Sequence, residues 1–105
     1  MNKYSDKSDF EINKAVAVNI NGSDAVVEKF GRIYISDSDA MVSFDPCSNP
    51  YDAMPIIIEN GISSLFNDDE WICSAPYTEF LSINESLYRA AMEVFLMMKE
   101  AENEK

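Results

Sequence analysis

The sequence contains no histidine, only two cysteines and only three glycines in 105 residues. Without imidazole it lacks the commonest general base and the commonest nitrogen ligand for zinc. Cys47 and Cys73 form no CxxC pair, and two thiols alone do not complete a zinc site. The glycines lie far apart, which excludes a glycine-rich phosphate-binding loop. We therefore expect no metal ion, no cofactor and no enzymatic activity.

Basic residues are also scarce, since eight lysines and arginines stand against nineteen acids, for a net charge of −11. The imbalance is concentrated in residues 45–105, which carry twelve acids and three bases, against seven and five in residues 1–44. Such a surface repels nucleic acids and anionic membranes, so we expect neither as a direct partner. The simpler interpretation is that the negative charge keeps the protein soluble. The alternative is that an acidic face binds a basic protein, for instance by resembling DNA.

Long hydrophobic runs are absent. A run such as VFLMM at residues 94–98 is far shorter than the roughly 20 residues that a membrane-spanning helix needs. The first ten residues, MNKYSDKSDF, lack the apolar stretch of a signal peptide. We expect a cytoplasmic protein whose two cysteines are reduced, with a disulfide as the alternative.

What is present favours a folded domain, because 47% of the residues are apolar and 11% aromatic. We expect one domain over residues 1–105, with residues 1–7 and 100–105 frayed. Ser8 and Glu11 form a capping box that predicts a helix over residues 8–18. Three short strands follow, predicted at AVVEKF (25–30), RIYIS (32–36) and MVSF (41–44).

The second half of the chain predicts a helix, a hairpin and a last helix. MPIIIEN (54–60) is helical, capped by Asn49 with Pro50 at the first position, or alternatively by Asp52, and it ends at Gly61. ISSLF and WICSA flank NDDE, which predicts a hairpin with a four-residue loop. Ser82 with Glu85, or else Asn84, starts the last helix. The order α-β-β-β-α-β-β-α favours an α+β fold with one antiparallel sheet of about four to five short strands.

The stretch FDPCSNPYDAMP at residues 44–55 is the first candidate site. In the functional interpretation its prolines hold a rigid loop at a helix start, where free backbone N–H groups attract anions. In the structural interpretation the prolines set turns and the polar side chains cap the helix or bond to the loop backbone. We favour the structural interpretation, because no histidine can activate the cysteine. The candidate binding residues are Asp45, Cys47, Asn49 and Asp52.

The last helix offers a second candidate, because the five consecutive apolar residues 94–98 surround its whole circumference. Such a turn belongs either to a helix in the centre of the core, which we favour, or to an interface with a second copy of the chain. Arg89 interrupts this apolar segment, and we expect it to form an ordinary surface pair with Glu85 or Glu93. The possible interface residues are Met92, Phe95, Leu96, Met97 and Met98.

Three segments together resemble the NinX-like family, small proteins of lambdoid phages and of prophages in enteric bacteria, with no established function. They are SDFEINKAVA (8–17), FDPCSNPYDAMPIIIENGIS (44–63) and RAAMEVFLMM (89–98). The family's central motif is matched by Phe44, Asp45, Pro46, Cys47, Asn49, Pro50, Asp52, Ala53 and Pro55. Ser48 replaces the usual asparagine, and Met54 the usual tryptophan, which puts an aromatic-stacking role at position 54 in doubt. The resemblance implies a phage or prophage origin and the host cytoplasm, but no reaction.

Three hypotheses follow. The first is a small acidic phage accessory protein that binds a host or phage protein with a basic surface. The second is a small-molecule or nucleotide binder, or a minor enzyme, that uses the loop at residues 44–55. The third is a structural homo-oligomer, such as a dimer, joined through the last helix.

Overall fold

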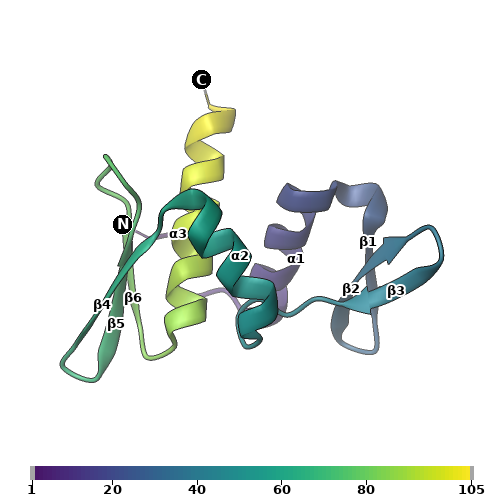
Figure 1. Cartoon of the computed structure of the whole chain (residues 1–105), viewed down its shortest axis with the longest axis horizontal. Helices are drawn as coiled ribbons and strands as arrows, with labels where there is room; N and C mark the ends of the chain where they lie inside the picture. Colours follow the sequence, from purple (N-terminus) through teal and green to yellow (C-terminus); the bar gives the residue numbers. More distant parts are fainter. Residues whose placement is uncertain (1, 105) are drawn as a thin grey trace.

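The computed structural model describes residues 2–104, which form three α-helices and two separate three-stranded sheets. Helix α3 crosses the middle of the molecule, with one sheet on one side and α1 and the other sheet on the other side (Figure 1). The elements in chain order are α1 Asp9–Asn21, a short 3-10 turn Ser23–Ala25, β1 Val26–Lys29, β2 Arg32–Asp37, β3 Ala40–Ser43, α2 Pro50–Asn60, β4 Ser63–Asn67, β5 Glu70–Ser74, β6 Leu81–Asn84 and α3 Leu87–Asn103.

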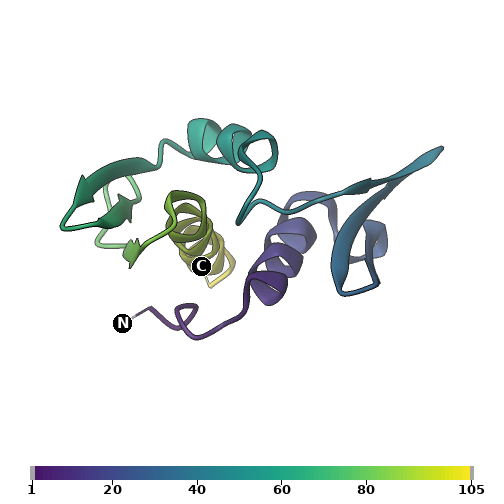
Figure 2. The same cartoon turned by 90° about the horizontal axis from the view of Figure 1, so that it is seen from below.

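The α+β class and the antiparallel pairing are confirmed, but the single sheet of four to five strands is wrong. The strands form two sheets, with the orders β1-β2-β3 and β4-β5-β6. The strands are divided because α2 lies between β3 and β4 in the chain. This helix takes the chain past α3, from the side of the first sheet to the side of the second (Figure 2). Within residues 2–104 no helix is both long and apolar enough to cross a membrane.

Helix α1 begins as predicted, with Ser8 and Glu11 in a reciprocal capping box. It ends at Asn21, three residues later than predicted, because the β-branched residues after Ala17 stay helical until Gly22. Gly22 has a φ of 85°, which L side chains rarely adopt. Ile12, Val16 and Ala17 form the buried stripe of the helix.

The first sheet is a meander beside α1, with Val26, Ile35 and Val42 side by side on three strands. Its three strands correspond closely to the three predicted ones. The β1–β2 turn is Phe30–Gly31, with φ values of 54° and 71°. Positive φ at both central residues is what a two-residue turn matching the strand twist requires.

Helix α2 starts at the first of the two predicted caps. The side chain of Asn49 accepts a hydrogen bond from the backbone N–H of Tyr51 at 3.0 Å, and Pro50 is the first helical residue. The helix ends at Gly61, which has the predicted left-handed conformation with a φ of 63°. Both ends of α2 are thus fixed by local sequence.

The second sheet differs from the prediction in two places. The β4–β5 strands extend through Asn67 and Glu70, so the turn is the pair Asp68–Asp69 and not the four-residue loop NDDE. Residues 81–84 form strand β6, where the sequence predicted a helix start. Here Ile72 pairs with Ile83 and Ser74 with Leu81, and this pairing outweighs the capping signal. Ser86 caps α3 instead, accepting from the N–H of Arg89.

Helix α3 is the centre of the core. Eight consecutive residues, 89–96, are buried, and the helix packs against α1, α2 and the second sheet. The face of the second sheet that carries Cys73 and Ser82 packs toward α3, and both side chains are buried. The free thiols of Cys47 and Cys73 both lie in this interior.

Arg89 pairs with Glu93, one of its two predicted partners, but the pair is buried and not at the surface as predicted. The Arg89 side chain bonds to the carboxylates of Glu93 and Asp9, and it also donates to the backbone carbonyls of Tyr4 and Lys7. The bonds to Tyr4 and Lys7 attach part of the segment 1–7, which we expected to be frayed, to α3.

Candidate functional site: the 44–52 loop and an acidic groove

The loop that precedes α2 is organised around Asp45. Its carboxylate accepts a hydrogen bond from the side-chain amide of Asn13 at 2.8 Å, and its backbone N–H donates to the carboxylate of Asp52 at 2.9 Å. Its carbonyl accepts from the N–H groups of Ser48 and Asn49 at 3.1 and 2.8 Å. Asp45 therefore ties the loop to α1, to α2 and to itself.

Cys47 lies inside this network. Its side chain is 2% exposed, and its N–H donates to the side-chain oxygen of Asn13 at 3.0 Å. Burial raises the pKa of the Cys47 thiol to about 12, with the charge of Asp9 as the next contribution. At neutral pH the group is therefore a thiol and a weak nucleophile.

The four predicted loop residues do not converge on one opening. Cys47 is buried, Asp45 and Asp52 are half-buried, and Asn49 is exposed at the start of α2. Asp45 alone of the four lines a polar pocket of about 400 Å³, together with Asp9, Arg32 and Ser48 among others. Each of the four side chains has a hydrogen-bond partner: the amide of Asn13 for Asp45, the carbonyl of Asp9 for Cys47, the N–H of Tyr51 for Asn49 and the N–H of Asp45 for Asp52.

Asn13 is the residue that the sequence analysis missed, although it links Asp45 to Cys47 from α1. A signal was available: Asn13 falls beside Ile12 and one turn before Val16 and Ala17 on the apolar stripe of the helix. A polar residue in such a position is buried and needs a partner.

The possible interface on α3 lies mostly in the core. Met92, Phe95 and Leu96 are at most 3% exposed, and only Met97 and Met98 are half-buried. The apolar turn is therefore enclosed by the domain itself, as in the alternative that we favoured. Only Met97 and Met98 remain for a contact with another molecule.

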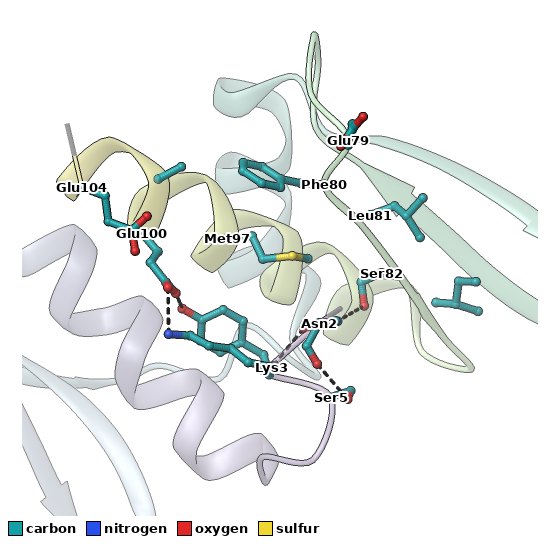
Figure 3. Close-up of a pocket in the computed structure, with 13 residues that line it drawn as sticks. Asn2, Lys3, Ser5, Glu79, Phe80, Leu81, Ser82, Met97, Glu100 and Glu104 are labelled. Atoms are coloured by element: carbon teal, nitrogen blue, oxygen red, sulfur yellow. Dashed lines mark hydrogen bonds and ion pairs between the residues drawn. The ribbon is translucent and has the colours of Figure 1, made fainter.

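Met97 lines a groove of about 620 Å³ that the sequence did not indicate (Figure 3). One wall is strand β6 with the two residues before it, the second is the last part of α3, and the third is the segment Asn2–Ser5. The apolar residues that line the groove are Tyr4, Phe80, Leu81, Ile83, Met97 and Ala101.

The charged residues of the groove are three carboxylates, those of Glu79, Glu100 and Glu104, and one ammonium group, that of Lys3. Lys3 is already paired with Glu100 at 2.8 Å. Among the described residues, neither Glu79 nor Glu104 is in an ion pair. The groove therefore combines an apolar lining with an excess of negative charge.

Tyr4 connects the groove walls, because its hydroxyl donates to the carboxylate of Glu100 at 2.5 Å across 96 residues of sequence. Burial raises the pKa of the Tyr4 hydroxyl, and the bond to Glu100 and the charge of Glu104 raise it further. The bonds from Lys3 and Tyr4 lower the pKa of Glu100. Both shifts favour the bonded pair of neutral phenol and carboxylate at neutral pH.

A second exposed surface is the outer face of α2. Tyr51 is 89% exposed and Ile58 is 70% exposed, with Met54 between them on the same side of the helix. Pro50, Pro55 and Glu59 complete this surface, and Glu59 is its one Asp, Glu, Lys or Arg residue. It is therefore apolar, whereas the groove is acidic.

Comparison with known proteins supports the resemblance drawn from the three segments. Residues 3–99 match the family described as Bacteriophage P22, NinX. Neither the curated proteins nor the solved structures gave a match. Because the match to the family covers most of the sequence, from the wall of the groove to the last turns of α3, this chain belongs to the NinX family of phage proteins.

Proposed function

We propose that this NinX-family protein is a phage accessory protein that acts in the host cytoplasm by binding another protein, of the phage or of the host. The partner presents a basic surface with apolar side chains. The observation that carries the proposal is the groove between β6, α3 and the segment Asn2–Ser5, because its lining is apolar and its charged residues are mainly acids.

The charge of the groove favours it over the outer face of α2. The chain has a net charge of −11, so its long-range field attracts cations and repels a second copy of itself. In the groove this field coincides with Glu79 and Glu104, which form no ion pair within residues 2–104. Apolar contacts supply affinity there, while carboxylates at the rim select basic partners and speed association.

The test compares partners retained from phage-infected cells by three forms of the protein. The wild type is compared with a groove variant, Glu79→Gln with Glu104→Gln, and with a control variant, Asp68→Asn with Asp69→Asn. Both variants remove two negative charges, and the control does so in the β4–β5 turn. We expect a protein that the wild type and the control retain, that the groove variant loses, and whose retention falls with salt.

Two results would contradict the proposal. In the first, the wild type retains no more than an unrelated protein of equal charge does. In the second, the groove variant and the control variant lose the partner to the same extent, which makes the interaction a matter of net charge alone.

A second candidate function is the binding of a small molecule or nucleotide beside the 44–55 loop. The polar pocket of about 400 Å³ that includes Asp45 and Arg32 favours it, because a cation and carboxylates there face the same space. Arg32→Gln tests it without touching the loop network. A ligand screen in which hits for the wild type disappear with Arg32→Gln supports this function, and a screen without hits contradicts it.

A further inference from the structure

We propose that the partner binds in the groove as an extended segment that adds a strand to the free edge of β6. This inference rests on the proposed function, and it specifies the conformation and the side-chain pattern of the segment that is bound. Its basis is the combination in one place of an unpaired strand edge, an apolar lining and an acidic rim.

Within residues 2–104, the outer edge of β6 pairs with no other strand. In the order β4-β5-β6 this strand is the last one, paired with β5 on one side only. Among the described residues, the bonds from Asn2 to this region go to side chains, those of Ser82 and Glu93, and not to the strand backbone. As far as the described part of the chain is concerned, the backbone groups on the outer side of β6 can therefore pair with an added strand.

The hydrogen-bond pattern identifies which groups these are. The N–H of Ala75 donates to the carbonyl of Phe80 at 3.1 Å, next to the pair formed by Ser74 and Leu81. In an antiparallel ladder, hydrogen-bonded and non-hydrogen-bonded pairs alternate. Ser82 and Asn84 therefore bond to β5, while the N–H and C=O groups of Leu81 and Ile83 point away from it.

Leu81 and Ile83 are also groove residues, so the free edge runs along the groove wall. A strand added to β6 lies about 4.8 Å away from it. In that position it has β6 on one side and Met97 of α3 nearby (Figure 3). Tyr4 and Ala101 also line the groove, from the other two walls. Such a site, between a strand edge and a helix, gives affinity through backbone bonds and specificity through alternate side chains.

The lining defines the sequence of the segment. Alternate side chains of an added strand point to opposite faces, so one set meets the apolar residues Tyr4 and Met97. The segment needs lysine or arginine where it passes Glu79 and Glu104. We infer an extended segment of a partner protein in which apolar residues alternate with basic or polar ones.

The other sheet edge, β4, lacks this combination. Ser63–Asn67 are all exposed, and none of them lines the acidic groove. A second copy of the chain is also a poor occupant of the β6 groove, because each copy carries a charge of −11. The unpaired edge of β6 and the acidic residues of the groove therefore both favour a basic segment of a partner protein.

The experiment uses synthetic peptides and the full-length protein. A displayed library of nine-residue peptides is selected on the wild type, with the groove variant Glu79→Gln, Glu104→Gln for counter-selection. We expect enriched peptides in which lysine or arginine alternates with apolar residues. Failure to enrich any basic peptide overturns the proposed function, and the strand-addition proposal with it.

Amide hydrogen exchange then tests the binding mode with an enriched peptide. The amides of Leu81 and Ile83 are expected to exchange at least about tenfold more slowly when the peptide is bound. Those of Ser82 and Asn84, which already bond to β5, serve as controls in the same strand. A bound peptide that leaves Leu81 and Ile83 unprotected overturns strand addition while leaving the proposed function intact.

A modified peptide gives a second, independent readout. Methylation of the peptide nitrogens that donate to β6 removes those bonds without changing charge, and we expect affinity to fall by about tenfold or more. Methylation of the intervening nitrogens is the matched control. Equal affinities for the two methylated series, both close to that of the parent peptide, also overturn strand addition.

Discussion

Arg89 and Glu93 form an ion pair inside the protein, with Nε of Arg89 2.5 Å from Oε2 of Glu93 and side chains 8% and 1% exposed. The same guanidinium donates to the carboxylate of Asp9 and to the carbonyls of Tyr4 and Lys7. Glu93 in turn accepts from Ser82 in β6. One buried charge pair thus joins the three walls of the groove.

Arg89→Met should therefore destabilise the protein strongly, since it leaves the carboxylate of Glu93 buried without its charge partner. Breaking a buried pair in this way costs about 3–5 kcal/mol. Urea unfolding measures the loss, with Lys99→Met as the control, because the partly exposed Lys99 of the same helix pairs with the exposed Glu102. A change of less than about 1 kcal/mol for Arg89→Met would show that the pair is not essential to the fold.

The loop network predicts a smaller loss for Asn13→Ala. The substitution leaves Asp45 and the N–H of Cys47 without the partners that Asn13 provides. An unsatisfied buried polar group costs about 1–3 kcal/mol. Asn19→Ala, which removes an exposed side-chain bond on the same helix, should cost much less. Equal unfolding free energies for the two variants would contradict a structural role for the loop network.

The two thiols should be unreactive in the native protein. Cys47 and Cys73 are at most 2% exposed, and burial raises their pKa values from 9.0 to about 12 and about 11. We expect a thiol reagent at neutral pH to modify neither residue until the protein unfolds. Fast modification of Cys47 in the native state would instead show an accessible thiol in the loop.

The raised pKa values of the two thiols also predict how the stability of the protein changes at alkaline pH. Because the folded pKa values lie above the unfolded value of 9.0, the stability from neutral thiols is fully present below pH 9.0. It is lost as the pH rises from 9.0 toward 11 and 12. Cys73→Ala, which cannot ionise, should show a smaller loss over this range, as measured by urea unfolding.

The attachment of the N-terminal segment should weaken in acid. Lys3 and Tyr4 hold the pKa of Glu100 below its ordinary value of 4.5. A lowered folded pKa means that the stabilisation is present above pH 4.5 and is lost as the pH falls through the folded pKa. The NMR signals of the Tyr4 ring should then move toward those of an unstructured tyrosine.

Glu100→Gln is the control for this acid effect, because the amide does not titrate in that range. We expect the Tyr4 ring signals of this variant to stay nearly constant between about pH 5 and about pH 3. If the wild type and Glu100→Gln show the same pH dependence, another group governs the attachment.

Local signals were sufficient to predict much of the fold. Ser8 with Glu11, Asn49 with Pro50, and Gly61 each act through the backbone within one helical turn, so their neighbours in sequence determine the outcome. Strand β6 was missed because its pairing with β5 depends on the register of Ile72 and Ile83 and outweighs the capping signal. The two-sheet arrangement depends in the same way on where α2 carries the chain.

The sequence was sufficient to predict a loop before α2, but not the hydrogen bonds that connect this loop to the rest of the protein. The bond between Asp45 and Asn13 spans 32 positions, and that between Tyr4 and Glu100 spans 96. No local pattern encodes contacts of this length. The groove was missed for the same reason, because its walls come from the two ends of the chain and from β6.

The most direct test of the central claim is to locate the bound partner segment by NMR of side-chain methyl groups. The account predicts that an enriched basic peptide shifts the methyl signals of Leu81, Ile83 and Met97 in the groove. It also predicts that the signals of Met54 and Ile58, on the exposed face of α2, stay unchanged. Shifts confined to Met54 and Ile58, with the groove signals unmoved, would contradict it.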